Sequence, residues 1–247
     1  MYLKRLGVST PVTVSQQTLI DWHERHVRTI PFENLDIHYG RYIVLDKTRV
    51  FQKIMQGGRG GFCYELNYLF CELLKEAGFD AWMISARVTT SEGMPGPPFD
   101  HLAIVVRMDN LWLLDVGFGD LFVKPVAITP GLIQHDGRNY FKIEQDTAPG
   151  DYALVMSADG QTFQKKYVFE LTPRAITDFE DFCRDKQISA DSYFVKNIVC
   201  TLPTEAGRVT LFNDRLIETQ GSEKHEAPVT DEAHRRELLA ARFGISI

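Results

Sequence analysis

The chain has 247 residues, of which 44% are hydrophobic and 24% charged, as in ordinary globular proteins, and its net charge of −6 argues against bulk binding to nucleic acid. No run approaches the roughly 18 apolar residues of a membrane span, and the first residues lack the apolar core of a secretory signal. The four cysteines form no CxxC pair, which indicates a reducing compartment, the cytoplasm, rather than a disulfide scaffold.

The first third of the chain predicts three helices, over about 16–29, 47–56 and 63–77. Ser15 and Asp46 stand before the first two as capping residues. In the third helix, apolar residues recur at three- and four-residue steps, which is the strongest helical pattern in the chain.

The middle of the chain changes to short strands. We expect a strand over 81–90, a Gly/Pro-rich loop over 91–100, and a hairpin of strands at 101–108 and 111–118. Further short runs with strand character follow at 121–128, 139–144, 152–156 and 163–171. Several short strands at regular spacing suggest a barrel or a curled sheet.

The end of the chain mixes both kinds of element. Helices are predicted near 173–184 and 230–242, with strand-like runs at 195–200 and 208–212 between them. The order of helices, strands and a mixed segment predicts an α+β fold. Its three parts are expected at 1–85, 86–185 and 186–247.

The stretch RGGFCYEL, residues 59–66, places a cysteine at the predicted start of the third helix. A helix N-terminus and a neighbouring imidazolium both lower the pKa of a thiol, so Cys63 is a candidate nucleophile. Gly60 and Gly61 would leave room for an acyl group, whose oxygen could face the Cys63 N–H. The alternative is that Cys63 is a small buried apolar residue, as most cysteines are.

His101 and Asp115 offer the partners that such a nucleophile needs. Asp115 stands in the apolar run WLLDVGF, where a carboxylate is costly unless a charged or donating group meets it. An aspartate can fix the tautomer of a histidine that takes the thiol proton. If the hairpin loop is 108–110, Asp115 faces Ala103, on the same face as His101 and within diagonal reach. A two-residue loop would put them on opposite faces, so this triad requires a loop of odd length or a bulge.

Plainer interpretations of these residues stay open at this point. His101 would then be an ordinary histidine at a strand end, and Asp115 a carboxylate that caps local amides. A metal centre is disfavoured, because Cys63 and Cys71 are eight residues apart on one helix and cannot reach one ion. The other histidines show no HxxxH or HExxH spacing, so we expect no metal.

Three motifs together resemble the signatures of arylamine N-acetyltransferases, in particular prokaryotic-type members of that family. They are RGGFCYELN (59–67), DHLAIVV (100–106) and DVGFG (115–119). PFENLDIHYG (31–40) and YLKRLGV (2–8) resemble further stretches common in the family, and a weaker similarity continues through 198–211.

The resemblance implies an acyltransferase of xenobiotic metabolism with a catalytic triad of Cys63, His101 and Asp115. Such an enzyme transfers an acetyl group from acetyl-coenzyme A to the nitrogen of arylamines, arylhydrazines or N-hydroxyarylamines, by a ping-pong mechanism through an acetyl-cysteine. The implied fold has an N-terminal helical domain with the nucleophile, a central β-barrel with the histidine and aspartate, and a C-terminal α/β lid. Its catalytic core is akin to that of cysteine proteases and transglutaminases.

Further residues are assigned through the resemblance alone. Phe118, Phe32 and Phe99 are candidates for a ring-lined substrate slot, with ordinary core packing as the alternative. The expected coenzyme contacts are Gly96, Pro97, Pro98 and Thr204. The expected partners are therefore a small aromatic amine or hydrazine and coenzyme A, with no nucleic acid, membrane or metal.

Two rival functions remain. A cysteine hydrolase or transglutaminase-like enzyme would use the same triad with water or a protein amine as acceptor, although the glycine pattern and DVGFG argue against it. A catalytically silent protein that binds aromatic ligands would retain the fold, but it would usually have lost one of the three catalytic residues, all of which this chain keeps.

Overall fold

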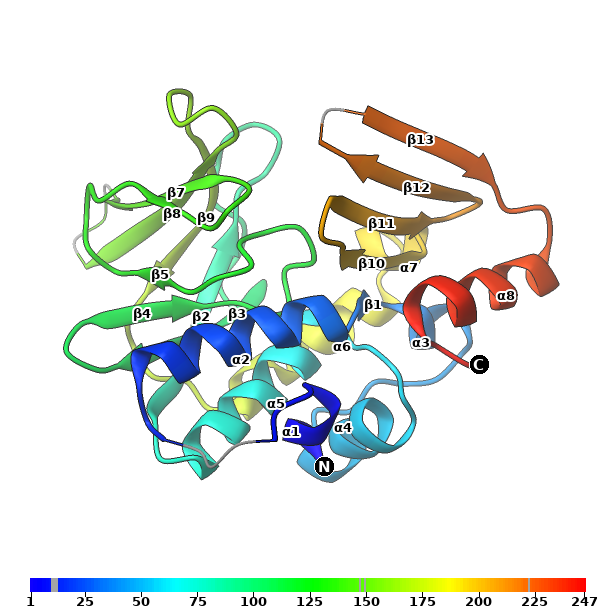
Figure 1. Ribbon diagram of the computed structural model, residues 1–247, viewed down its shortest axis with the longest axis horizontal. Coiled ribbons are helices and arrows are strands. Elements are labelled where there is room, and N and C mark those ends of the chain that lie inside the picture. The colour runs from blue at the N-terminus through cyan, green and yellow to red at the C-terminus, as the bar shows by residue number, and fades with distance from the viewer. Residues whose placement is uncertain (10–12, 147, 149, 222) are drawn as a thin grey trace.

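The helices of the first third lie beside two antiparallel sheets (Figure 1). The structure is a computed structural model that describes residues 1–9, 13–146, 148, 150–221 and 223–247. The early helices are α1 Tyr2–Arg5, α2 Gln16–Thr29, α3 Leu35–His38, α4 Lys47–Phe51, the π-helix η1 Gln52–Gln56 and α5 Cys63–Glu76.

The predicted capping residues set the starts of two of these helices. Ser15 Oγ accepts the Thr18 N–H at 3.1 Å, and Asp46 Oδ1 accepts the Arg49 N–H at 2.9 Å. Each bond satisfies one backbone donor that the first turn leaves without a partner. Helix α5 begins at Cys63, so the predicted position of the thiol at a helix start is confirmed.

The larger sheet curls into a nearly closed barrel. Its strands, in spatial order, are β5 Val126–Ala127, β4 Leu111–Leu114, β3 His101–Arg107, β2 Asp80–Val88, β9 Gln164–Glu170, β8 Asp151–Ser157, β7 Tyr140–Gln145 and β6 Gln134–His135. An isolated bridge joins Pro130, in the segment after β5, to Ile143 of β7, the strand next to the other edge of the sheet. The predicted barrel is confirmed, although β5 is far shorter than the run expected at 121–128.

The hairpin of β3 and β4 has the three-residue loop that the triad requires. Arg107 pairs with Leu111, and Ile104 pairs with Leu114. The ladder ends at Leu114, so Asp115 follows the strand rather than lying within it. The predicted odd-length loop is confirmed.

The smaller sheet joins the two ends of the sequence. Its order is β1 Phe32–Glu33, β10 Val199–Pro203, β11 Gly207–Phe212, β12 Arg215–Gln220 and β13 Glu223–Pro228. Strands β1, β12 and β13 were not predicted, and residues 195–196 lie in a helix instead of the expected strand. The helices of this half are η2 Ile176–Phe179, a 3-10 turn, α6 Glu180–Ile188, α7 Tyr193–Lys196 and α8 Glu232–Phe243.

The division into three domains stays a prediction, and strand β2 crosses residue 85 while helix α6 crosses residue 185.

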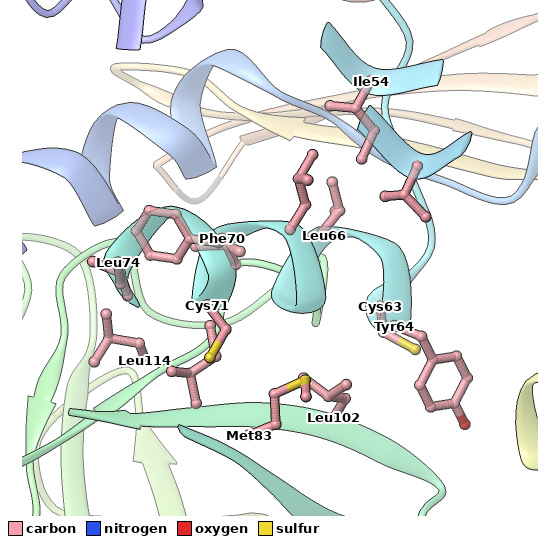
Figure 2. Packing of buried hydrophobic residues seen from close by; sticks show 14 of the residues in the cluster. Ile54, Cys63, Tyr64, Leu66, Phe70, Cys71, Leu74, Met83, Leu102 and Leu114 are labelled. Carbon is pink, nitrogen blue, oxygen red and sulfur yellow. The ribbon is translucent and has the colours of Figure 1, made fainter. Parts of the chain in front are cut away.

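Strand β3 separates two hydrophobic clusters. Leu102 and Ile104 pack with the helices, whereas Ala103 and Val105 belong to the barrel interior. Figure 2 shows α5 lying along the strands, with Cys63 at its N-terminal end. Helix packing thus brings the thiol to the end of the barrel where β3 begins.

Candidate active site

His101 and Asp115 form a buried hydrogen-bonded pair. Their Nε2 and Oδ2 atoms are 2.7 Å apart, and the two residues are 3% and 2% exposed. Because a carboxylate only accepts hydrogen bonds, Nε2 carries the proton and Nδ1 is left as a base. The imidazole ring packs against Phe118 and Tyr167, with ring centroids 5.3 and 5.7 Å away.

Three neighbours fix the position of Asp115. Asn67 Nδ2 and the Gly117 N–H both donate to Asp115 Oδ1, at 2.9 and 3.0 Å. His23 Nε2 accepts the Asp115 N–H at 3.2 Å, and its Nδ1 bonds the Val123 carbonyl at 3.0 Å. Burial lowers the pKa of His23 to about 4, so its ring is neutral, as these two bonds need. Asp115 therefore both orients a histidine and caps a local amide.

Asn67 was not assigned from the sequence, yet it joins the helix of the nucleophile to the aspartate. Besides Asp115, its Nδ2 donates to the Leu102 carbonyl at 2.6 Å, and its Oδ1 accepts the Val116 N–H at 2.9 Å. The signal was its position four residues after Cys63, which puts both side chains on one face of α5. We infer that Asn67 aligns the three candidate catalytic residues.

The expected role of the RGG glycines is wrong. A Cβ atom at Gly60 would lie 2.1 Å from the Pro31 carbonyl oxygen, and one at Gly61 would touch side chains of η1 and α5. These glycines therefore make room for the protein itself, not for an acyl group. Gly117 approaches the backbone of Cys63 instead, because a Cβ there would lie 2.7 Å from the Cys63 carbonyl oxygen.

A buried charge network fixes the start of α5. Arg59 Nη2 is 2.8 Å from Glu33 Oε1 and 3.0 Å from Asp36 Oδ1. Lys53 Nζ is 2.9 Å from Asp36 and 2.8 Å from Glu65. The Glu65 carboxylate also accepts the backbone N–H just before the helix, at 2.9 Å. Because each charge has a partner, the burial is tolerated and the helix start is held in place.

Cys63 and His101 line one cavity of about 470 Å³. Its walls come from the loop after β4, from β10 and β11, and from α6 and α7. The aromatic lining consists of Phe32, Phe118, Tyr193, Phe194 and Phe212. A thiol and an imidazole in a mostly apolar cavity of this size suit a small aromatic ligand.

Two ion pairs, not predicted from the sequence, line the same cavity. Lys186 Nζ is 2.5 Å from Asp100 Oδ1, and Arg208 Nε is 3.2 Å from Asp120 Oδ1. Arg208 Nη1 also donates to the Gly119 carbonyl. The second pair thereby ties strand β11 to the loop that carries Phe118.

The expected low pKa of Cys63 is wrong. Burial raises the pKa of this thiol well above its usual value, and the nearby charge of Lys186 opposes the shift only partly. The carboxylates of Asp100 and Asp115 and the Cys183 thiol act in the same direction as burial. Burial also raises the pKa of Cys71 and Cys183, in each case to about 12. What distinguishes Cys63 is its place in the cavity beside a base.

The three phenylalanines expected in a substrate slot line two different cavities. Phe32 and Phe118 line the cavity with Cys63. Phe99 lines a second cavity of about 390 Å³, and its ring packs on Phe179, with centroids 5.4 Å apart.

The residues expected to contact the coenzyme belong to two segments, the loop before β3 and the turn between β10 and β11. Gly96 donates its N–H to the Val88 carbonyl at 2.8 Å, and the Pro97 carbonyl accepts the Asp100 N–H at 3.4 Å. Pro98 lines the second cavity with Phe99. In the turn between β10 and β11, Thr204 Oγ1 accepts the Gly207 N–H at 3.0 Å.

Known proteins are similar to the chain over most of its length. A family model described as N-acetyltransferase matches residues 15–247. The arylamine N-acetyltransferase, pineal gland isozyme NAT-10, of Gallus gallus is 30% identical over 87% of this chain and 80% of its own. The arylamine N-acetyltransferase / N-hydroxyarylamine O-acetyltransferase of Salmonella typhimurium is 29% identical over 100% of this chain and 86% of its own.

Solved structures agree with this similarity. An arylamine N-acetyltransferase from Salmonella typhimurium superposes with a TM-score of 0.91 at 26% identity, covering 99% of this chain and 89% of that one. An arylamine N-acetyltransferase from Bacillus cereus has a TM-score of 0.91 at 28% identity, covering 100% and 97%. That protein is described as having a unique Cys-His-Glu catalytic triad, whereas His101 here pairs with an aspartate.

Proposed function

The chain belongs to the arylamine N-acetyltransferase family, and we propose that it transfers an acetyl group from acetyl-coenzyme A to the nitrogen of arylamines, arylhydrazines or N-hydroxyarylamines. It is an acyltransferase. The observation that carries the proposal is the His101–Asp115 pair, with Nε2 and Oδ2 2.7 Å apart, at a cavity that also exposes the Cys63 thiol.

The first half of the reaction acetylates the enzyme. His101 Nδ1 takes the Cys63 proton, and Asp115 stabilises the imidazolium that forms. The thiolate attacks the thioester carbonyl, so a bond from Cys63 Sγ to the acetyl carbon forms and the bond to the coenzyme sulfur breaks. His101 then returns the proton to the departing thiol. Because one thioester replaces another, the acetyl group on Cys63 stays reactive.

The second half consumes the acetyl-cysteine. An aromatic amine is mostly neutral at pH 7, so its nitrogen can attack the acetyl carbon. His101 removes the proton from the attacking nitrogen, and Cys63 leaves as a thiolate that the imidazolium reprotonates. The rings of Phe32 and Phe118, which line the same cavity as Cys63, support an aromatic acceptor.

Acetyl-coenzyme A serves here as a co-substrate, and we place the enzyme in the cytoplasm. All four cysteines are free, which supports a reducing compartment. Among the described residues, no helix has the length and apolar character needed to cross a membrane. Within the same ranges, no group of three potential metal-ligating side chains is gathered at one point.

Intact-mass measurement after mixing with acetyl-coenzyme A, without an amine, tests the proposal. We expect a gain of about 42 mass units that disappears when an aniline or hydrazide is added, because the acetyl-cysteine accumulates until an acceptor arrives. Cys71→Ala, a change farther along the same helix, should still gain the adduct, whereas Cys63→Ala should not.

Two other outcomes would point elsewhere. Loss of the adduct in buffer alone, as fast as with an amine, would indicate a hydrolase. A folded protein that binds anilines but never gains the adduct would indicate a silent binding protein.

A further inference from the structure

The two residues before His101 form a turn in an unusual backbone conformation. Phe99 has a φ of +62°, a left-handed value that a bulky side chain rarely adopts and that stores strain. Pro98 and Phe99 line the second cavity, whereas Asp100 and His101 line the catalytic one. The turn at Phe99 is therefore the point at which the chain directs His101 into the catalytic cavity.

Side chains from α5 and β2 hold this turn. Tyr64 Oη donates to the Phe99 carbonyl at 2.9 Å and to the Asp100 carbonyl at 3.0 Å. Ser85 Oγ accepts the Phe99 N–H at 2.8 Å. Tyr64 is fully buried and directly follows Cys63, and Figure 2 shows its hydroxyl directed away from the helix.

The Tyr64 hydroxyl is a dependable donor at this place. Burial raises the pKa of Tyr64, so the hydroxyl keeps its proton. A strained backbone persists only where its surroundings enforce it, and both carbonyls of this turn depend on the one hydroxyl proton. The same contact joins the residue after the thiol to the residues before the base.

We propose that Tyr64 is a positioning residue, whose hydroxyl holds the Phe99–Asp100 turn so that His101 is aligned with the Cys63 thiol. The inference rests on the proposed function for its kinetic consequence, but the alignment can also be measured without any acyl transfer. Phe99 also packs on Phe179, and Asp100 is paired with Lys186, and neither contact involves the Tyr64 hydroxyl. The Tyr64→Phe variant is therefore expected to fold.

The experiment compares Tyr64→Phe with Tyr68→Phe. Tyr68 lies four residues further along α5 and belongs neither to the lining of the catalytic cavity nor to the contacts that hold the turn. We expect Tyr64→Phe to slow acetylation of Cys63 about fivefold to tenfold, as for one lost buried hydrogen bond, with little change in KM for acetyl-coenzyme A. Tyr68→Phe should leave the rate unchanged.

A double-mutant cycle separates alignment from general damage. The readout is the rate of Cys63 alkylation by iodoacetamide as a function of pH, which needs no acyl donor. The charged and titratable groups around Cys63 are Asp100, His101, Asp115, Cys183 and Lys186. With His101 present, Tyr64→Phe should slow alkylation and shift its pH midpoint upward. In the His101→Asn background it should have no further effect.

An equal slowing by Tyr64→Phe with and without His101 would overturn the inference, as would a Tyr64→Phe variant that matches wild type. Ser85→Ala removes the other anchor of the turn and should act in the same direction, which keeps the test decisive if Tyr64→Phe misfolds. A wild-type protein that is alkylated rapidly but never acetylated would refute the proposed function, and the alkylation cycle would then decide the inference alone.

Discussion

Strands β3 and β13 are similar in length but lie in opposite surroundings. Of the seven residues of β3 only the last is exposed, whereas every residue of β13 is exposed. Strand β3 lies inside the barrel sheet between β2 and β4, and β13 is the free edge of the smaller sheet. Each strand carries one histidine, His101 or His225. Burial of a polar side chain costs free energy unless it is hydrogen-bonded, so a buried histidine suggests a functional role. This argument applies to His101 and not to the exposed His225.

The largest expected effect lies in the buried region. Asp115→Asn keeps the shape of the side chain but loses the carboxylate that orients His101, so the wrong imidazole tautomer becomes available. We expect acetylation of Cys63 to slow by a factor of about 10³ to 10⁴, in single-turnover mass measurements, with the melting temperature largely kept. Asp109→Asn, in the exposed loop at the other end of the β3–β4 hairpin, should change neither. Comparable slowing by both substitutions would contradict the assigned pair.

A smaller effect is expected where Gly117 packs against Cys63 and Asn67. A Cβ at Gly117 would lie 2.7 Å from both Asn67 Nδ2 and the Cys63 carbonyl oxygen, and 2.9 Å from Cys63 Cα. Gly117→Ala should therefore lower the free energy of unfolding by about 2–3 kcal/mol. At Gly221, in the β12–β13 hairpin, an added Cβ would meet open space, and only the φ of +58° would be strained. Gly221→Ala should therefore lower the free energy of unfolding by only about 1 kcal/mol. Urea unfolding of both variants checks the difference. Equal decreases in the free energy of unfolding would show that the backbone around Gly117 can shift to accept a Cβ.

The buried His23 makes stability depend on pH. Its folded pKa is about 4, against about 6.5 in the unfolded chain, so between these values the unfolded state binds more protons. The contribution of His23 to the free energy of unfolding is therefore fully present above pH 6.5. It falls by about 2 kcal/mol between pH 7 and pH 5. Buried His26, whose pKa is lowered in the same direction, adds to the loss.

Chemical unfolding at pH 7 and pH 5 tests this contribution. His23→Gln should reduce the pH dependence, whereas His225→Gln on the exposed strand should leave it as in wild type. A His23→Gln protein that keeps the full loss between pH 7 and pH 5 would rule out His23 as the cause.

The smallest effect is expected on β13 itself. Lys224 pairs with Glu226 on the exposed strand, its side chain 57% exposed. Such a surface pair adds little to stability, so Lys224→Ala should shift the melting temperature by less than about 2 °C and leave acetylation unchanged. Calorimetry would check this, and a large fall would mean that the outer strand supports the cavity.

The sequence was sufficient for features that depend on local pattern. The α5 start at Cys63 followed from a glycine pair before an apolar helical repeat. Counting residues through the hairpin showed that a pairing of His101 with Asp115 requires a loop of odd length, and the β3–β4 hairpin has one. The α+β order followed from the change of hydrophobic period along the chain.

The rest depended on contacts between distant segments. Nothing near His23 in the sequence reveals that it bonds the backbone at Asp115, and the pair of Lys186 with Asp100 joins helix α6 to the loop before β3. The pKa of Cys63 was misjudged because the helix N-terminus is visible in the sequence, while the burial that raises the pKa is a property of the assembled fold. Strands β12 and β13 were missed because β12 buries only one residue and β13 buries none, so neither shows a hydrophobic alternation.

Strand β1 has a consequence for the order in which the protein is made. Its two residues pair with β10, and the Glu33 N–H also donates to the Gly61 carbonyl at 2.9 Å, in the loop before Cys63. A ribosome that has just finished the thiol-bearing helix must still add the whole barrel before β10 emerges, which takes on the order of ten seconds. During that interval the nascent chain carries the Cys63 thiol without strands β10 and β11, which form one wall of the cavity. The cavity around Cys63 is therefore completed late in synthesis, when β10 pairs with β1 near the start of the chain.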